Sequence, residues 1–317
     1  MKDIGQRHTG VSLREAVPYV RLFKGKTFIV KVGGALLTDD AATREVLAQI
    51  DALMHLGIRV VLVHGGGAQA STLSRALGSE PRFVGGRRIT DAPALAAAVA
   101  TLNGEANTTL LAACRALGIA AVGLSGVDSA LVRARRRPPV LVEGETVDYG
   151  HVGDVVAVDP GVLDRLLAGG TLPVVSPLAA DDEGNVLNCN ADGVAAALAV
   201  AMGAAKLVLL TDVAGLLERP DDPRSLVSYI DVAGLARLRG RGVLAGGMAP
   251  KAAAIETALA GGVARAHLVS WHTPDGLLAE LFTNEGSGTL VVPELGTLSP
   301  AEKTAEAAAQ TAEAPVT

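Results

Sequence analysis

The chain has 317 residues, 49% of them hydrophobic and 19% charged, with a formal net charge of −5 at pH 7. A chain of this length and composition can bury a large core and has the size of a soluble enzyme. The negative charge and the scarcity of aromatic residues, three Tyr, four Phe and one Trp, argue against a nucleic-acid-binding surface.

The residue pattern contains no membrane, secretion or zinc signal. The longest uninterrupted apolar run, residues 193–205, is shorter than a bilayer-spanning helix requires. The first residues form no apolar signal core, and the two cysteines, Cys114 and Cys189, are too few for a disulfide framework. The six histidines show no ligand spacing. We therefore expect a cytoplasmic protein without a membrane partner and without a protein-bound metal.

In chain order, the first predicted element is a helix over residues 12–23. Ser12 and Glu15 have the spacing of a capping box, and an apolar helical stripe follows them. Pro18 is expected to kink this helix. The helix either packs on its own domain or pairs with its copy in another subunit.

Strand and helix patterns alternate after this helix. Strand-like runs lie near residues 27–33, 59–64, 120–124, 173–176, 206–211, 266–270 and 288–292. Helical runs lie near residues 41–56, 67–78, 92–117, 159–169, 191–203, 247–262 and 275–282. The alternation predicts an α/β protein with a mostly parallel sheet covered by helices. Residues 138–147 predict a hairpin that turns at Glu143 and Gly144, and residues 181–185 predict a second turn.

Two glycine clusters stand where a strand gives way to a helix, Lys31-Val32-Gly33-Gly34 and His64-Gly65-Gly66-Gly67. Glycine lets backbone N–H groups approach an anion closely, and the helix that follows adds the positive end of its dipole. Two such exits from one parallel sheet predict a site that holds phosphate or carboxylate groups.

Charged and amide side chains accompany the glycine clusters. Lys31 interrupts an apolar strand, so it either has an anionic partner or is a structural lysine that reaches the strand end. Asn188-Cys189-Asn190-Ala191-Asp192 opens a helix with more polar groups than capping requires. Gly246-Gly247-Met248-Ala249-Pro250-Lys251 places a lysine in a first helical turn, which is unfavourable without an anion nearby. Thr211-Asp212-Val213-Ala214-Gly215-Leu216 ends a strand in a loop that suits either a nucleotide edge or a plain turn.

Two common nucleotide-binding patterns fit poorly. The chain contains no G-x-x-x-x-G-K-[ST] motif of a P-loop enzyme. Gly65-Gly66-Gly67-Ala68-Gln69-Ala70 matches the weak dinucleotide pattern, but the acidic residue expected at the end of the next strand is missing, since Glu80 lies in a turn. A nicotinamide-dependent enzyme is therefore a minor alternative.

The set of motifs resembles the amino acid kinase family. Gly86-Arg87-Arg88-Ile89-Thr90-Asp91 joins the five motifs given above, and all six occur in the order seen in that family, within residues 12–292. The resemblance implies a three-layer αβα sandwich around a mostly parallel sheet. It also implies four parts: an oligomerisation helix (1–24), an N-terminal lobe for an acyl amino acid and for dimerisation (25–190), a C-terminal lobe for ATP (191–292) and a flexible tail (293–317).

Within the family, the chain is most similar to members that phosphorylate the side-chain carboxylate of N-acetyl-L-glutamate with ATP in arginine biosynthesis. Mg²⁺ is then expected to arrive bound to ATP. The resemblance implies the catalytic residues Lys31, Lys251 and Asp192. It implies substrate-binding roles for Gly66, Gly67, Arg88 and Asn188. It implies nucleotide-binding roles for Gly33, Gly34, Thr211, Asp212, Gly215, Leu216, Gly246 and Met248.

Some positions depart from the pattern of the relatives. Gly85-Gly86-Arg87-Arg88 stands where relatives often have Asn-Gly-Leu-Arg, so either Arg87 or Arg88 contacts the substrate, with Arg88 favoured by its place before Ile-Thr-Asp. Retention of Gly67 and of residues 190–192 favours the free acetylated amino acid over carrier-linked aminoadipate or glutamate. A non-catalytic arginine sensor of the same fold is the other alternative.

The N-terminal helix is similar to that of an arginine-inhibited, hexameric branch of the family. This resemblance implies a homo-oligomer, a trimer of dimers, with L-arginine as an inhibitor and Tyr19, His267 and Glu285 as its contacts. Ser270-Trp271-His272 is instead similar to the arginine-insensitive branch. A docked signalling protein of the PII type is not predicted or excluded by the sequence.

Overall fold

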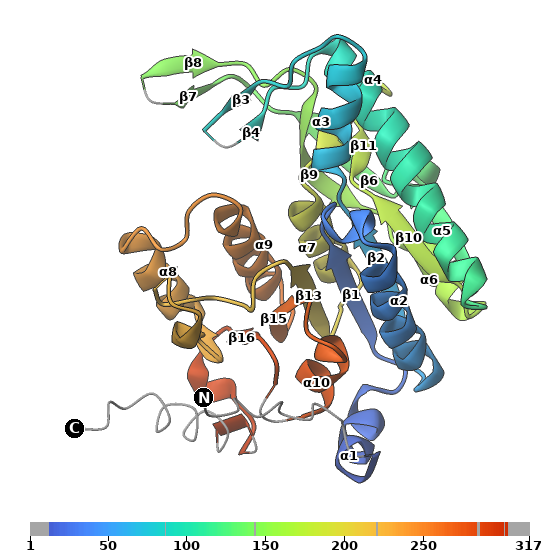
Figure 1. The fold of residues 1–317 in the computed structure, drawn as a ribbon, viewed down its shortest axis with the longest axis vertical. Coiled ribbons are helices and arrows are strands. Elements are labelled where there is room, and N and C mark those ends of the chain that lie inside the picture. The colour runs from blue at the N-terminus through green and yellow to red at the C-terminus, as the bar shows by residue number, and fades with distance from the viewer. Residues whose placement is uncertain are drawn as a thin grey trace, which may run out of the picture.

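The computed structural model describes residues 13–85, 87–142, 144–219, 221–283, 286–300 and 302–303. Its centre is an eight-stranded sheet with the strand order β14-β16-β15-β13-β1-β2-β10-β5 (Figure 1). These strands are β1 (Thr27–Val32), β2 (Arg59–His64), β5 (Ala121–Ser125), β10 (Leu172–Ser176), β13 (Lys206–Thr211), β14 (Tyr229–Asp231), β15 (Arg265–Ser270) and β16 (Thr289–Val292). All neighbours pair in parallel except β15 with β16. The expected mostly parallel sheet is confirmed.

Helices cover both faces of this sheet because its central strands are apolar on both sides. One face carries α1 (Leu13–Phe23), α2 (Asp40–His55), α5 (Asn107–Ala116) and α10 (Gly276–Phe282). The other carries α6 (Gly161–Ala168), α7 (Ala191–Ala201), α8 (Val232–Gly240) and α9 (Met248–Ala260). In β1, Phe28 and Val30 point to the first layer and Ile29 to the second. The result is the expected three-layer αβα sandwich.

Shorter strands lie beside the main sheet. β6 (Val132–Arg136), β9 (Val152–Val158), β11 (Leu178–Ala180) and β12 (Val186–Cys189) close into a small four-stranded barrel. The hairpin predicted over residues 138–147 is present as β7 (Val140–Val142) and β8 (Glu145–Val147). A second hairpin pairs β3 (Phe83–Val84) with β4 (Arg87–Arg88). The turn predicted at residues 181–185 connects β11 to β12.

Three regions differ from the expected elements. The single helix expected over residues 92–117 is α4 (Ala92–Val99), a π-helical segment (Ala100–Ala106) and α5. β14 and α8 were not expected. Within residues 293–317, a 3₁₀ helix (Leu295–Thr297) follows β16, and Leu298 packs on Leu290 and Val292.

Other expectations match the structure or fall outside it. α3 (Gly67–Ala76) matches its prediction. Residues 1–12, with the expected capping residue Ser12, and residues 304–317 of the expected tail lie outside the described residues. Among the described residues, no helix is long and apolar enough to cross a membrane.

Candidate active site

The two glycine clusters meet at the carboxyl ends of β1 and β2. These strands pair in register from Thr27 with Arg59 to Val32 with His64, so both chains leave the sheet at the same edge. The Gly65 N–H donates to the Val32 carbonyl at 2.9 Å. A Cβ on Gly34 would lie 3.1 Å from the Gly66 Cα and 2.6 Å from Gln69 Oε1, so the loops pack too closely for a larger residue. The register therefore brings the two loops together.

Lys31, Asp192 and Lys251 form a charged group beside these loops. Lys31 Nζ lies 2.7 Å from Asp192 Oδ1, and Lys251 Nζ lies 3.7 Å from Asp192 Oδ2. Lys31 is 5% exposed and Asp192 is 4% exposed. Burial lowers the pKa of Lys31, and the charge of Asp192 opposes this shift. Lys31 thus has the anionic partner that its place in an apolar strand requires.

Local structure fixes the positions of Asp192 and Lys251. The Asn190 side chain caps α7 by accepting a hydrogen bond from Gly193 N at 3.0 Å, which places Asp192 in the first turn of α7. Lys251 lies in the first turn of α9, and its Nζ donates to the Gly247 carbonyl at 3.3 Å. Two helix N-termini and two ammonium groups therefore converge on one carboxylate. Such an arrangement attracts anions.

A cavity of about 230 Å³ adjoins this group, and we call it the glycine-loop cavity. Its walls contain the predicted residues Lys31, Gly66, Gly67, Arg88, Asn188 and Asp192. They also contain apolar residues that the sequence interpretation missed, Ala70, Ala98, Leu102 and Pro177. Ala98 and Leu102 lie in the helical run 92–117, where an apolar residue facing a cavity has the same pattern as one facing the core. Arg87 does not line the cavity.

Arg88 reaches the cavity from the β3–β4 hairpin. Its Nη2 donates to the Gly67 carbonyl at 2.8 Å and to the Ser71 hydroxyl, and its guanidinium lies 5.0 Å from the centre of the Phe83 ring. Burial lowers the pKa of Arg88, and the charge of Arg75 adds to this shift. A partly desolvated guanidinium at a cavity wall suits a bidentate carboxylate contact.

The residues expected to bind nucleotide lie outside the glycine-loop cavity. Thr211 is the last residue of β13, which pairs with β1. Asp212 follows it, and the negative charge of Asp212 raises the pKa of Lys31. Leu216 is buried in the core, and its N–H donates to Thr289 Oγ1 at 2.9 Å. Its side chain packs in the core and its main chain fixes the loop. A Cβ would have open space within 4 Å at Gly33, Gly67, Gly246 and Gly247, so these backbones are open to an approaching group.

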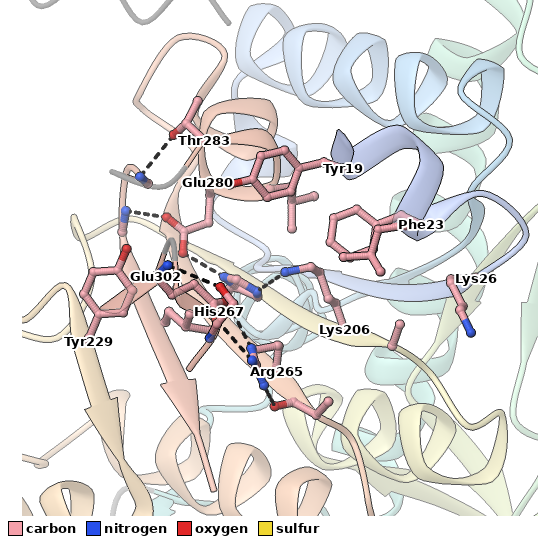
Figure 2. A pocket seen from close by; sticks show the side chains of 18 of the residues that line it. Tyr19, Phe23, Lys26, Lys206, Tyr229, Arg265, His267, Glu280, Thr283 and Glu302 are labelled. Atoms are coloured by element: carbon pink, nitrogen blue, oxygen red, sulfur yellow. Dashed lines mark hydrogen bonds and ion pairs between the residues drawn. The ribbon is translucent and has the colours of Figure 1, made fainter. Parts of the chain in front are cut away.

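A second cavity, of about 310 Å³, lies beside α1, and we call it the α1 pocket (Figure 2). Tyr19 and His267, two of the three expected arginine contacts, line it, whereas Glu285 lies outside the described residues. The buried Lys206 Nζ donates to His267 Nε2 at 2.9 Å, and His267 Nδ1 donates to Glu280 Oε1 at 2.7 Å. Burial lowers the pKa of Lys206 to about 8 and that of His267 to about 4. Lys206 and Glu280 had no signal in the sequence that separated them from ordinary strand and helix residues.

The rim of the α1 pocket carries a further ion pair. Arg265 Nε and Nη2 each lie 3.1 Å from a Glu302 carboxylate oxygen (Figure 2). Arg265 Nη2 also donates to the Thr297 carbonyl at 2.9 Å. Glu302 Oε2 accepts a hydrogen bond from Ser299 N at 2.6 Å. The pKa of Glu302 falls to about 2 despite partial burial, because Arg265 and Ser299 stabilise the carboxylate. The pocket therefore contains two carboxylates, Glu280 and Glu302.

Among the described residues, no group of three or more His, Cys, Asp or Glu side chains is placed to hold a metal ion. Both oxygens of Asp192 face ammonium groups. This carboxylate therefore forms ion pairs with both lysines.

His64, at the end of β2, is buried and gives the fold a pH dependence. Its Nδ1–H donates to the Gly65 carbonyl at 3.0 Å, and its Nε2 accepts from Asn107 Nδ2 at 3.3 Å. Burial lowers its pKa to about 4. Between pH 6.5 and 4 the unfolded chain binds a proton that the folded chain does not, so stability falls as the pH is lowered through this window. The expected loss from His64 is about 2 kcal/mol at pH 5.

Urea unfolding at pH 7 and pH 5 measures this loss. The His64→Gln variant cannot take up the proton, so its stability should fall by about 2 kcal/mol less than that of the wild type between the two pH values. An equal fall in the two proteins would contradict a neutral buried His64.

The model of the amino acid kinase family matches residues 26–270. The chain therefore belongs to the amino acid kinase family. It is 50% identical to the acetylglutamate kinase of Myxococcus xanthus (strain DK1622) over 289 residues, which cover 89% of this chain and 94% of that relative. It is 41% identical to the acetylglutamate kinase of Archaeoglobus fulgidus over 284 residues, which cover 89% of this chain and 98% of that relative.

Solved structures show the same fold. An N-acetylglutamate synthase from Neisseria gonorrhoeae, complexed with coenzyme A and N-acetyl-glutamate, matches with a TM-score of 0.76 and 30% identity over 89% of this chain. The chain spans 62% of the length of that synthase. A carbamate kinase from Giardia matches with a TM-score of 0.60 and 16% identity over 85% of this chain, and it shares the fold.

Proposed function

We propose that this protein transfers the γ-phosphoryl group of ATP to the side-chain carboxylate of N-acetyl-L-glutamate, a reaction of arginine biosynthesis. The observation that carries the proposal is the buried Lys31–Asp192–Lys251 group beside a cavity lined by Arg88 and Asn188. Relatives between 39% and 50% identical, matched over at least 94% of their own lengths, are named acetylglutamate kinases. The products are N-acetyl-L-glutamyl 5-phosphate and ADP.

The reaction needs no general base, because a side-chain carboxylate is already ionised at neutral pH. One carboxylate oxygen forms a bond to the γ-phosphorus while the bond from that phosphorus to the β,γ-bridging oxygen breaks. ADP leaves with the electron pair of that bond. Lys31 and Lys251 balance the negative charge on the transferring oxygens, and Asp192 holds both ammonium groups in place.

The glycine-loop cavity binds the acetylated amino acid in this proposal. Arg88 pairs with the α-carboxylate, Asn188 bonds an amide or carboxylate oxygen, and the N–H groups of Gly66 and Gly67 face the substrate. The apolar wall that contains Ala98 and Leu102 suits the acetyl methyl group. Residues 25–190 thus supply most of the substrate site.

ATP binds along the same sheet edge, chiefly over residues 191–292, with Gly33 and Gly34 contributed by the first glycine cluster. The open backbones of Gly33, Gly246 and Gly247 fit phosphate groups, and the N-terminus of α9 faces them. Gly34, Thr211, Asp212, Gly215 and Met248 complete the proposed nucleotide site. Mg²⁺ that arrives with ATP would neutralise phosphate charge and would be held chiefly by phosphate oxygens, because both oxygens of Asp192 pair with lysines.

An ATP-dependent hydroxamate assay tests the reaction, since hydroxylamine traps an acyl phosphate. N-acetyl-L-glutamate should yield hydroxamate, whereas glutamate, aspartate and N-acetyl-aminoadipate should yield little. Turnover of a carrier-linked substrate alone would support the related kinases instead. Folded protein that forms no hydroxamate from any of these carboxylates would contradict the proposal and favour a non-catalytic sensor.

The α1 pocket favours a second function, inhibition by L-arginine. A free arginine presents one carboxylate, one ammonium and one guanidinium group. The α1 pocket offers the ammonium of Lys206 and the carboxylates of Glu280 and Glu302, a complementary set. Tyr19 comes from α1, so a bound ligand would contact both this helix and the C-terminal lobe (Figure 2).

Glu302 gives this second function a specific test. In Glu302→Gln, Arg265 loses its carboxylate partner, the pocket becomes more positive, and a cationic ligand binds less well. We expect L-arginine to inhibit the wild type and the half-inhibitory concentration to rise about tenfold in the variant, as for the loss of one charge-assisted contact. Rates are compared with the uninhibited rate of each protein.

Glu294→Gln is the matched control, because Glu294 is exposed in the same segment and does not line the pocket. Its arginine response should equal that of the wild type. A wild-type rate that is unaffected by L-arginine would contradict the regulatory proposal and agree with the arginine-insensitive branch.

A homo-oligomer, built as a trimer of dimers, is the proposed assembly. α1 supports it, because Leu22 is 63% exposed and Val17 is also exposed on this helix. Apolar side chains on a terminal helix suit pairing with the same helix of another subunit. Light scattering should give six times the chain mass, and a monomeric mass would contradict this assembly.

A further inference from the structure

The β3–β4 hairpin, which carries Arg88, is too small to hold its own shape. Each of its strands has two residues, and an isolated two-stranded hairpin is marginally stable in water. Arg88 nevertheless has to be fixed if it is to pair with a substrate carboxylate. Its position must therefore depend on contacts from elsewhere in the chain.

Tyr149 supplies a contact to this hairpin from the segment that follows β8. Its hydroxyl donates to the Val84 carbonyl at 3.0 Å. Tyr149 is 2% exposed, and a buried phenol needs a hydrogen-bond partner. The Arg137 guanidinium lies 5.9 Å from the centre of its ring and is itself paired with Asp154. Arg137 thus fixes the ring of Tyr149, and the hydroxyl of Tyr149 fixes β3.

The β7–β8 hairpin lies against the same loop. Figure 1 shows the two hairpins side by side above the sheet edge. A Cβ on Gly85 would lie 3.2 Å from Val142 Cγ1 and 3.7 Å from the Tyr149 hydroxyl, which shows how closely the two hairpins approach. The tip of the β3–β4 hairpin is therefore packed against β7 and Tyr149.

The main chain of Tyr149 and His151 extends this link to the other proposed substrate contact. Thr90 N donates to the Tyr149 carbonyl at 2.9 Å, and His151 N donates to the Thr90 carbonyl at 2.7 Å. Asn188 N donates to the His151 carbonyl at 2.8 Å, and Asn188 Nδ2 donates to Thr90 Oγ1 at 3.4 Å. One short segment thus positions both Arg88 and Asn188.

Gly150 allows this segment to pass so close to Thr90. Its φ is +71°, in the left-handed region that favours glycine, and a Cβ there would lie 2.4 Å from the Thr90 carbonyl oxygen. A side chain at this position would push the two segments apart. The glycine at position 150 therefore permits the close approach of this segment to Thr90.

From this geometry we propose that Tyr149 is a positioning residue for the carboxylate substrate, acting through Arg88. The inference rests on the proposed function of the glycine-loop cavity. The Tyr149 hydroxyl holds β3 and, through the hairpin, the Arg88 guanidinium at the cavity wall. Arg88 binds the end of the substrate that does not react, so its loss of position weakens ground-state and transition-state binding alike.

The Tyr149→Phe variant removes only the hydroxyl and keeps the ring. The KM for N-acetyl-L-glutamate should rise about 3- to 10-fold, the effect of losing one neutral hydrogen bond, while kcat and the KM for ATP change less than twofold. Leu141→Ser, in β7 of the adjacent β7–β8 hairpin at a side chain that is 75% exposed, is the control and should leave all three constants unchanged. Thermal melting confirms that the variants are folded.

A double-mutant cycle separates positioning from general stability. If Tyr149 acts through Arg88, Tyr149→Phe should have little further effect on KM in the Arg88→Ala background. A full additional rise in that background, or an unchanged KM in the single variant, would overturn the inference.

Calorimetric binding of N-acetyl-L-glutamate keeps this inference separate from the proposed catalysis. Wild-type protein that binds the ligand without phosphorylating it would overturn the proposed reaction alone, and a 3- to 10-fold weaker Kd in Tyr149→Phe would still support positioning. Equal Kd values in wild type and variant would overturn the role of Tyr149. Wild-type protein that does not bind the ligand would overturn both proposals.

Discussion

Replacing Lys31 with methionine is expected to lower kcat by about 10²- to 10³-fold. Methionine keeps the length and the apolar stem of lysine but removes the ammonium that lies 2.7 Å from Asp192 at the wall of the glycine-loop cavity. The charge that develops on the transferring phosphoryl oxygens then loses one of its two lysine partners. The initial rate of hydroxamate formation at saturating ATP and N-acetyl-L-glutamate measures the effect.

Lys24→Met provides the control, because Lys24 is exposed after α1 and lies outside the glycine-loop cavity. Its kcat should equal that of the wild type. Retention of more than a tenth of the wild-type kcat by a folded Lys31→Met protein would remove Lys31 from the catalytic group.

The second large effect is expected from Asp192→Asn, with kcat lowered about 10²-fold. The amide has no charge to hold the ammonium groups of Lys31 and Lys251, although its shape fits the same space. Without the opposing carboxylate, burial lowers the pKa of Lys31 further. The fraction of charged Lys31 then falls as the pH rises, so the rate of the variant should recover as the pH is lowered.

A pH series of kcat for the wild type and Asp192→Asn tests this account. Asp182→Asn is the control, because Asp182 pairs with Arg133 on the surface. A variant whose activity loss is the same at every pH would contradict the assignment of Asp192 as the group that keeps Lys31 charged.

Seven of the eight strands of the main sheet could be predicted, because each is a largely apolar run that alternates with helical patterns. β14 could not be predicted, because its three residues are too few to form a recognisable run. β6 could not be predicted, because the sequence Val132–Arg136 has the pattern of a basic run and not of a strand. In the structure Val132 and Ala134 are buried and the arginines of β6 are exposed, and Arg133 and Arg136 pair with Asp182 and Asp148. The residues that pair with β6 lie 17 to 26 positions further along the chain in β9 and 47 positions further in β11, so no local pattern reveals the small barrel.

The charged part of the candidate site could also be predicted, since a lysine in an apolar strand and a lysine at a helix start both require an anion. The apolar part could not. Leu102 faces the cavity from a π-helical segment, which changes the side-chain direction within a continuous helical run. Tyr149 had no sequence signal, because its role depends on a contact with Val84, 65 residues earlier.

In the α1 pocket, too, some residues could be predicted from the sequence and others could not. Tyr19 and His267 were expected there, but Lys206 and Glu280 join them only when β13, β15 and α10 are packed together. Lys206 begins an apolar strand and Glu280 lies in an apolar helix. Their burial as charged partners is a property of the tertiary structure.

An oxygen-isotope measurement shows whether a substrate carboxylate oxygen attacks the γ-phosphorus. N-acetyl-L-glutamate labelled with ¹⁸O in its side-chain carboxylate is incubated with ATP, hydroxylamine and the protein, and the released phosphate is examined by mass spectrometry. Hydroxylamine attacks the acyl carbon, so the bridging carboxylate oxygen leaves with the phosphate. Attack by the carboxylate places one ¹⁸O in each phosphate formed. Phosphate without ¹⁸O would show that water, and not the carboxylate, accepts the phosphoryl group.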